Sequence, residues 1–415
     1  MSPTTDRHSR LLPSLAPQLD NPPGPGDEAL EAHALLNDAI AARATDVHLD
    51  PVQAAYRIRL RIDGRVIDAL RIDAAHGLRL ANQLKVLSGL NPVPSLVTAE
   101  GSFNWPLEVG GDEEAFLRVT AVNCVAGEKL AIRLLGSPRS FDDPLDLGIG
   151  KQAAQGIRRW MDATGGMLLV AGPTGAGKTT TLYTLLNQLR LTDSHVVTLE
   201  DPVEYEIPGI NQIQVDSHAG LDFDTGTRSI LRLDPDYVLI GELRSPASAQ
   251  ACLNVASSGR SLMGTLHSRD AVGVISSLRH LELTDGEISA NLGMVIGQRL
   301  VRKLCQQCRI QGEPETDDIE WLDAIGLSIP DSVWSAPGCT HCNDLGYRGR
   351  TGIFEVWQLT PEDHARILRH DDEAILRRGL VERGEVLMLS DGLAKAEAGI
   401  TTLREVLRMG AILPV

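Results

Sequence analysis

The spacing of apolar residues changes along the chain, and the changes mark its domains. From Asp27, "DEALEAHALLNDAIAARA" repeats apolar residues at helical spacing with an acidic first turn, which predicts a helix. "DVHLD", "AAYRIRLRID" and "RVIDAL" then alternate apolar with polar residues, which predicts strands with a turn at Asp63-Gly64. A helical stretch, "GLRLANQLKVLSGL", and two more alternating stretches, "AFLRVTAV" and "EKLAIRLL", complete a small α+β domain over residues 27–135.

A second change of period follows residues 136–148, whose Gly, Pro and Asp content predicts a linker. Short apolar runs ("MLLVA", "HVVTLE", "YVLIGEL" and "SLMGTLH") then alternate with helical segments, which predicts βαβ units and a parallel sheet over residues 149–300. We expect a cysteine-containing arm over residues 301–355 and packed helices over residues 356–415. Residues 1–26 are rich in Pro, Ser and Gly, and we expect them to form a disordered leader.

Composition narrows the class of protein. A chain of 415 residues has room for two to three domains with sizeable cores. Its apolar content of 43% and charged content of 23% are typical of a globular protein. The net charge of −16 argues against a surface that coats nucleic acid. We find no apolar run of about 18 residues and no secretory signal, so we expect a cytoplasmic protein.

A glycine-rich stretch follows the strand predicted at "MLLVA". "GPTGAGKTT" contains the pattern Gly-x-x-x-x-Gly-Lys-Thr, in which backbone N–H groups surround phosphate oxygens at a helix N-terminus. Lys178 would reach the β- and γ-phosphates, and the Thr179 hydroxyl would bind Mg²⁺. The candidate nucleotide-binding residues are Gly172, Pro173, Thr174, Gly175, Ala176, Gly177, Lys178, Thr179 and Thr180.

Acidic residues end two other predicted strands. "DPDYVLIGEL" places Glu242 after an apolar run, as a candidate Mg²⁺ partner. "VVTLEDPVEYE" ends in Glu200, Asp201 and Glu204, and carboxylates crowded at a phosphate site need a metal or a basic partner, or one must take up a proton. We favour Glu204 as the general base. His267 ends "SLMGTLH", at a sheet edge where ligands of open α/β sheets bind. The alternatives are solvating charges for the carboxylates and a structural role for His267.

Four of the six cysteines form two C-x-x-C pairs. The pairs are Cys305 with Cys308 and Cys339 with Cys342. This pattern fits one tetrahedral Zn²⁺ in a reducing compartment, and a site with four protein ligands is structural because it has no open position. Four reduced, unligated thiols or an iron–sulfur cluster are the alternatives. We expect Cys124 and Cys252 to be small core residues.

Four motifs in order carry a family resemblance. "GPTGAGKTTTLYTLL", "TLEDPVEYEIPGINQIQV", "ILRLDPDYVLIGELR" and "TLHSRDA" resemble the secretion ATPase superfamily, and more narrowly the hexameric motors of type II secretion and type IV pilus assembly. The similarity runs from about Leu36 to the C-terminus. It implies an α/β protein in which a PAS-like N-terminal domain is joined by a flexible linker to a RecA-like P-loop ATPase domain, closing into a ring of six.

The resemblance also implies roles for individual residues. Glu204 matches the catalytic glutamate of the family's Asp box, Glu242 matches the Walker B acid, and His267 matches the principal histidine of the His box. Arg118 and Arg133 stand where the family places arginines that reach the nucleotide across a subunit boundary. Such an arginine would stabilise transition-state charge. The alternative for both arginines is salt-bridging on a strand face.

The sequence departs from the family pattern at three places. Arg260 stands where the family usually has a histidine before an apolar strand. Ser245 replaces the acid of the usual "GEIRD". The second Asp-Gly-Arg turn of the first domain reads "AEGSF". Because Lys178 and the carboxylates remain, we still expect hydrolysis.

The function that the resemblance implies is a cytoplasmic, hexameric Mg-ATPase that drives assembly of a type IV pilus or a type II secretion pseudopilus through an inner-membrane platform protein. Its cofactors would be ATP, Mg²⁺ and Zn²⁺. Within the superfamily a cysteine arm marks assembly and secretion motors, and retraction motors characteristically lack it. The alternatives are a retraction motor, a DNA-uptake or conjugation ATPase, and a weakly active regulatory subunit. We expect no direct binding to nucleic acid, because no Lys/Arg-rich stretch with interleaved aromatic residues is present.

Overall fold

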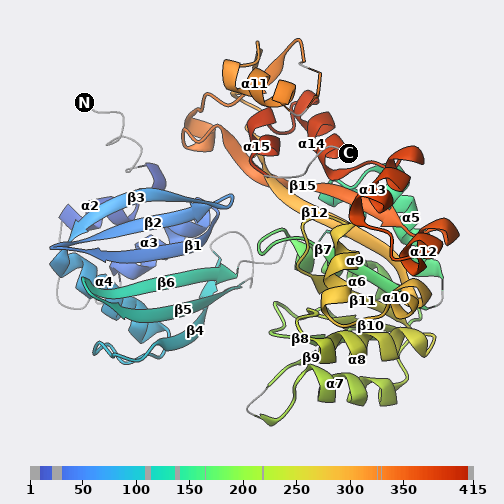
Figure 1. The fold of residues 1–415 in the computed structure, drawn as a ribbon. Helices are drawn as coiled ribbons and strands as arrows, with labels where there is room; N and C mark the ends of the chain where they lie inside the picture. Colours follow the sequence, from blue (N-terminus) through green and yellow to red (C-terminus); the bar gives the residue numbers. More distant parts are fainter. Residues whose placement is uncertain are drawn as a thin grey trace. The chain divides into compact units, whose positions relative to one another are not determined.

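The computed structural model describes residues 10–20, 30–107, 114–135, 141–163, 165–216, 219–324, 326–328 and 330–409. They fall into two compact units, drawn in Figure 1. The first unit holds residues 1–139 with 337–349, and the second holds residues 140–336 with 350–415. In the part of the chain that the structure describes, every helix is too short or too polar to cross a lipid bilayer.

The first unit is built on a six-stranded sheet in the order β3-β2-β1-β6-β5-β4, with antiparallel neighbours. The strands are β1 (Ala44–Val52), β2 (Ala55–Ile62), β3 (Arg65–Asp73), β4 (Ala99–Pro106), β5 (Glu114–Cys124) and β6 (Gly127–Leu135). Burial alternates along β2, so one face of the sheet is apolar. Helices α3 (Leu30–Ala41) and α4 (Ala74–Leu87) pack their leucines into the core on that face.

Among the described residues of this unit, β4 is the one strand that the pattern did not predict. Its sequence, "AEGSFNWP", mixes polar residues with Gly and Pro, which are rare inside strands. A Cβ at Gly101 would lie 2.3 Å from the Ser88 carbonyl oxygen at the end of α4, so the close approach of helix and strand requires glycine there. The turn predicted at Asp63-Gly64 is confirmed, with φ of 49° and 87°.

Residues 10–20 differ from the predicted disordered leader. They include helix α2 (Leu15–Asp20), and Leu11, Leu12 and Leu15 are buried in the core of the first unit. The backbone N–H groups of Ser14 and Leu15 donate to Asp38 Oδ2 at 2.8 and 2.9 Å. Three leucines within five residues provide enough apolar surface to hold the segment, although the surrounding composition is that of a disordered region. The rest of residues 1–26 lies outside the described residues.

The second unit holds a seven-stranded sheet in the order β15-β12-β7-β11-β10-β8-β9. The strands are β7 (Gly166–Ala171), β8 (Val196–Glu200), β9 (Asn211–Gln214), β10 (Tyr237–Ile240), β11 (Ser261–Leu266), β12 (Leu292–Leu304) and β15 (Tyr347–Gln358). Neighbours from β12 to β9 are parallel, as predicted. Both faces are covered, which explains why these strands are continuous apolar runs.

One face of this sheet packs against α5 (Lys151–Asp162) and α6 (Lys178–Leu189). The other face packs against α8 (Pro246–Ser257), α9 (Gly273–His280) and α10 (Asp285–Asn291), and Figure 1 shows these helices over β10 and β11. Helix α7 (Phe223–Ile230) packs beside α8. The tail contributes α12 (Pro361–Leu368), α13 (Glu373–Glu382), α14 (Met388–Glu397) and α15 (Leu403–Leu407).

Two predicted boundaries differ from the structure. In the predicted linker, residues 136–140 lie outside the described residues, whereas Pro144–Leu147 forms a 3₁₀ helix whose Leu147 is buried in the second unit. The predicted arm, residues 301–355, begins inside β12 and ends inside β15, because both strands continue across the predicted boundaries. Between them lie β13 (Ile310–Gly312), α11 (Thr316–Ala324) and β14 (Val333–Ser335), and β13 pairs with β14.

Candidate active site

The glycine-rich loop joins the end of β7 to the first residue of α6. Gly175 and Gly177 have φ of 78° and 85°, in the region that favours glycine. A Cβ at Gly172 would lie 2.5 Å from the Gln298 carbonyl oxygen, so this position too requires glycine. The loop therefore has the tight curvature that a phosphate-binding loop needs, with α6 starting at Lys178.

Gln298 of β12 holds this loop through side-chain hydrogen bonds. Its side chain is buried, accepts a hydrogen bond from Thr181 Oγ1 at 2.7 Å, and donates from Nε2 to the Ala176 carbonyl oxygen at 2.7 Å. One amide thus ties the loop to the first turn of α6. Gln298 was not predictable as a site residue, because nothing near it in the sequence points to the loop.

Lys178 lies where the loop predicts it. Its Nζ donates to the carbonyl oxygens of Gly172 at 2.8 Å and Pro173 at 3.4 Å. The Nζ atom is also 3.4 Å from Nδ1 of His267. Burial lowers the pKa of Lys178, and the charge of Glu242 partly opposes that effect. The ammonium group is therefore at the same sheet edge as the predicted histidine and Walker B acid.

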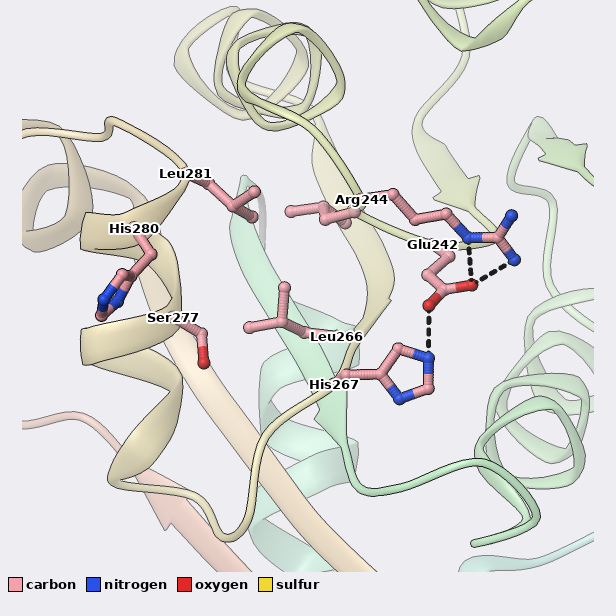
Figure 2. A pocket seen from close by; sticks show the side chains of 8 residues that line it. Glu242, Arg244, Leu266, His267, Ser277, His280 and Leu281 are labelled. Carbon is pink, nitrogen blue, oxygen red and sulfur yellow. Dashed lines mark hydrogen bonds and ion pairs between the residues drawn. The ribbon is translucent and has the colours of Figure 1, made fainter.

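Glu242 lies between a histidine and an arginine, as Figure 2 shows. Its Oε1 is 2.6 Å from His267 Nε2, and its Oε2 accepts hydrogen bonds from Nη2 and Nε of Arg244 at 2.6 and 2.7 Å. Arg244 Nη1 also lies 3.8 Å from Asp201 Oδ2. Lys178, His267 and Glu242 thus come from three different strand ends and form one polar cluster.

Arg244 is a site residue that the sequence analysis did not single out. It follows Glu242 by two residues in "GELR", and this position beside a carboxylate was the available signal. Its guanidinium pairs with Glu242 and lies near Asp201, so it offsets part of the negative charge at this edge. A basic partner, one of the possibilities raised for these carboxylates, is therefore present for Asp201 and Glu242.

Glu200, the last residue of β8, and Glu204, four residues later, lie in different environments. Glu200 is buried and accepts hydrogen bonds from Thr198 Oγ1 at 2.6 Å, from Gln212 Nε2 at 3.2 Å and from the Tyr183 hydroxyl. Glu204 is exposed. Because Glu200 is enclosed by protein donors and Glu204 faces solvent, Glu204 is the better placed of the two to meet a water molecule. Its role as the general base stays a prediction.

A cavity of about 550 Å³ opens beside Glu242 and His267. Its other walls come from Leu266 and from the end of α9, where Ser277, His280 and Leu281 lie (Figure 2). Thr179 opens α6 next to Lys178, and Glu242 follows β10 at the same edge of the sheet. The joint binding of Mg²⁺ by Thr179 and Glu242 stays a prediction.

Arg118 and Arg133 are direct cross-strand partners on β5 and β6 of the first unit. Both are exposed. Arg133 Nε lies 3.3 Å from Asp46 Oδ1, and the Arg118 guanidinium lies 5.8 Å from the centroid of the Phe116 ring. Two adjacent, like-charged side chains repel each other unless an anion lies nearby. The ion pair to Asp46 supports the salt-bridging alternative for Arg133, and the role of both arginines toward a nucleotide stays a prediction.

The four paired cysteines come together. The Sγ atoms of Cys305, Cys308, Cys339 and Cys342 all lie within 4.8 Å of one another. Four thiols gathered at one place are the arrangement that a shared tetrahedral metal site requires. Cys252 is a buried core residue, as expected, whereas Cys124 is exposed at the end of β5, so that expectation is wrong for Cys124.

The structure explains two departures from the family pattern. Ser245 is the N-cap of α8 and exchanges capping hydrogen bonds with Ser248, a task that serine performs as well as aspartate. Arg260 donates from Nε to the Pro235 carbonyl oxygen at 3.1 Å and pairs with Asp234 at 2.9 Å. It holds the turn before β10, at the opposite end of that strand from Glu242.

Comparisons with known proteins agree with this geometry. The family described as type II/IV secretion system protein matches residues 27–408. The HofB homologue of Escherichia coli, a protein transport protein, is 36% identical over 382 residues, which cover 90% of this chain and 79% of the relative. The type IV pilus assembly ATPase PilB of Myxococcus xanthus is 35% identical, covering 90% and 66%. The type II secretion system protein E of Klebsiella pneumoniae is 34% identical, covering 91% and 74%.

Solved structures show the same fold. The ATPase DotB of Legionella pneumophila has a TM-score of 0.68 at 19% identity and covers 93% of this chain and 96% of its own. The pilus retraction motor PilT with bound ADP has a TM-score of 0.59 at 20% identity and covers 91% and 96%. Given the match over residues 27–408 and the phosphate-loop geometry, the chain belongs to the type II/IV secretion system protein family and is a secretion ATPase with a RecA-like core.

Proposed function

We propose that this chain is a cytoplasmic, hexameric Mg-ATPase that drives assembly of a type IV pilus or of a type II secretion pseudopilus, acting on an inner-membrane platform protein. The observation that carries the proposal is the cluster of Lys178, His267 and Glu242 at the carboxyl edge of the parallel sheet. The assignment to assembly and secretion draws on relatives named for pilus assembly and type II secretion.

The reaction is transfer of the terminal phosphoryl group of ATP to water. Residues 172–180 and Lys178 would bind the phosphates, and Mg²⁺ held by Thr179 and Glu242 would neutralise developing charge. Glu204 would orient the attacking water and take its proton, while the bond from the γ-phosphorus to the bridging oxygen breaks and ADP leaves. His267 would contact the γ-phosphate, and Arg118 and Arg133 would reach it from the neighbouring subunit.

The cysteine cluster fits a structural Zn²⁺. Thiolates at about 2.3 Å from one tetrahedral ion stand about 3.8 Å apart, and Cys339 Sγ lies 3.8 Å from Cys342 Sγ. The backbone N–H groups of Cys339 and Gly346 donate to Cys342 Sγ, each at 3.2 Å, which favours a thiolate there. Cys305 and Cys342 are buried, and Cys308 and Cys339 are partly buried. Four sulfur donors without an open position fit structural zinc.

The cysteine cluster also helps to distinguish an assembly or secretion motor from a pilus retraction motor. Within the resemblance, retraction motors characteristically lack a tetracysteine arm, whereas assembly and secretion motors carry it. The likeness to the retraction motor PilT is one of fold, at 20% identity. A role in assembly or secretion is therefore better supported than a role in pilus retraction. An experiment in cells distinguishes the two.

Glu204→Gln tests the enzymatic core of the proposal. Loss of a general base lowers turnover by about 10²- to 10⁴-fold, so we expect a corresponding fall in kcat while ATP still binds. Glu206→Gln, which alters an exposed carboxylate two residues further on, is the matched control and should turn over at the wild-type rate. Equal turnover of the wild type and Glu204→Gln would contradict the role of Glu204.

The direction of work is tested in cells that carry Glu204→Gln in place of the native chain. An assembly or secretion motor without turnover leaves the surface without fibres, or leaves the secreted substrate inside the cell. A retraction motor without turnover leaves more fibres on the surface. Counting surface fibres by electron microscopy and measuring export in the same cells separates these outcomes.

A further inference from the structure

The loop between β8 and β9, residues 201–210, carries Glu204 and is pinned at several backbone positions. The Val203 N–H donates to Gln214 Oε1 at 3.2 Å. Gln212 accepts a hydrogen bond from the Ile207 N–H at 2.6 Å and donates to the Tyr205 carbonyl oxygen at 3.1 Å. Two glutamine side chains of β9 therefore hold the loop on both sides of Glu204.

Glu204 itself is held from another element. Its backbone N–H donates to the Tyr183 hydroxyl oxygen at 3.3 Å. Tyr183 belongs to α6, five residues after Lys178, which is about one and a half helical turns. The helix that begins at the phosphate-binding lysine thus makes a direct hydrogen bond to the backbone of the residue proposed as the base.

The Tyr183 hydroxyl is the centre of a buried network. It donates to the Glu200 carboxylate and accepts from Gln212 Nε2 at 3.4 Å as well as from the Glu204 N–H. The tyrosine is buried, and its ring contacts the Tyr205 ring edge-to-face with centroids 4.6 Å apart. Burial and the charge of Glu200 raise the pKa of Tyr183, so the hydroxyl keeps its proton and its donor role.

A network of this kind fixes geometry because the hydrogen-bonding capacity of the Tyr183 hydroxyl at its centre is fully used. A phenolic hydroxyl donates once and accepts up to twice, and here one carboxylate and two N–H donors occupy those positions. Loss of the hydroxyl would leave the Glu200 carboxylate short of one buried donor and the Glu204 N–H without its acceptor. The loop would then be free to shift relative to α6.

We propose that Tyr183 is a positioning residue for hydrolysis, whose hydroxyl sets the place of Glu204 relative to the helix that begins with Lys178. The inference rests on the proposed role of Glu204 as the general base. A base must stand within hydrogen-bonding reach of the attacking water, and a misplacement of about 1 Å can cost about 100-fold in rate. A hydrogen bond between the base and the phosphate-binding helix would hold the attacking water at a fixed position relative to the bound phosphate.

Tyr183→Phe in the full-length chain tests the proposal, because it removes the hydroxyl and keeps the ring that packs on Tyr205. We expect kcat to fall by about 10- to 100-fold with KM for ATP changed less than about twofold. Tyr237→Phe is the matched control. Tyr237 is also buried in the second unit, and its hydroxyl donates to the Met161 carbonyl oxygen at the opposite end of β10 from Glu242. We expect wild-type kcat for that variant.

A double-mutant cycle separates positioning from a general structural effect. If Tyr183 acts through Glu204, then Tyr183→Phe lowers turnover in the wild type and has almost no further effect in Glu204→Gln. Gln212→Met removes the loop contacts from the other side and should lower kcat in the same way. Equal fold losses from Tyr183→Phe in both backgrounds, or wild-type kcat in Tyr183→Phe, would overturn the inference.

Two of these variants, Glu204→Gln and Tyr183→Phe, distinguish this inference from the proposed function. If Glu204→Gln turns over like the wild type, the role of Glu204 fails, and the positioning inference fails with it. If Glu204→Gln is inactive while Tyr183→Phe keeps full kcat, the base assignment stands and only the role of Tyr183 is refuted. Thermal melting of each variant shows whether the comparison is made between folded proteins.

Discussion

Ser245 is a single residue whose departure from the family pattern has a physical explanation. Its hydroxyl accepts a hydrogen bond from the Ser248 N–H at 3.2 Å at the N-terminus of α8. We expect Ser245→Ala to lower the free energy of unfolding by about 1 kcal/mol, and Ser245→Asp to match the wild type. Urea unfolding followed by circular dichroism measures both. A Ser245→Ala variant as stable as the wild type would show that the cap contributes nothing.

Whether a residue of the site could be predicted depends on whether it stands in a short sequence motif or is placed by contacts with residues far away in the sequence. Lys178, Glu242 and His267 were predictable because each stands in a short motif at the end of an apolar strand. Tyr183 and Gln298 were not, since their partners lie 17 to 122 residues away in the sequence. A buried tyrosine in a helix reads as an ordinary core residue until the fold brings a carboxylate to it.

Elements of secondary structure were predictable wherever burial was one-sided or complete. The alternation of β2 and the apolar runs of β7 and β11 gave the correct element type, because sheet burial imposes those periods. Helix α2 and strand β4 were not predicted, because neither shows a periodic pattern of apolar residues. Each is short or polar in sequence and is fixed by contacts with the rest of its unit, which local composition does not reveal.

Helix α12 depends on a buried aspartate at its N-terminus. Asp363 accepts hydrogen bonds from the Thr360 N–H at 2.9 Å and from Trp357 Nε1 at 3.1 Å, and it pairs with both terminal nitrogens of Arg383 at 3.0 Å. Burial alone would raise the pKa of Asp363, but these hydrogen bonds outweigh it, and the net pKa is lowered.

The lowered pKa fixes the sign of a pH dependence. The stabilisation by Asp363 is fully present above the unfolded-state pKa of about 4 and is lost as the pH falls through the lower folded-state value. We expect Asp363→Asn to cost about 3 kcal/mol at pH 6, because it removes a fully buried charge and leaves the partly exposed Arg383 without its partner. Urea unfolding at both pH values should show that the difference in free energy of unfolding between the wild type and Asp363→Asn is smaller at pH 3.5 than at pH 6. Asp372→Asn, at the exposed N-cap of α13, is the control with a smaller loss.

At the scale of the whole molecule, the cysteine cluster predicts a measurable metal content. We expect about one Zn²⁺ per purified chain, and almost none in Cys342→Ser, because loss of one thiolate opens a tetrahedral site. Chelation of the wild type should lower its melting temperature, since metal-binding free energy is part of folding free energy. Elemental analysis and thermal melting measure these effects, with Cys124→Ser as the control. Iron in place of zinc would indicate that the four cysteines hold an iron–sulfur cluster instead.

The proposed ring makes a prediction that no single subunit can satisfy. If Arg133 completes the site of a neighbouring subunit, Arg133→Ala and Glu204→Gln are each inactive for different reasons. Each variant should lose at least about 100-fold in turnover as a homogeneous ring. In co-assembled rings, however, some interfaces combine an intact Glu204 from one subunit with an intact Arg133 from the next. Random assembly of equal amounts makes about a quarter of the interfaces complete.

Co-expression of the two variants should therefore restore turnover to a level well above either alone. The control is co-expression of Glu204→Gln with Lys178→Ala, whose defects both lie in the subunit's own site, so that no interface is complete. Recovery in the first mixture but not in the second would place the arginine in trans. Inactivity of both mixtures, or full turnover of Arg133→Ala alone, would instead favour the ion pair with Asp46 at 3.3 Å as the whole role of Arg133.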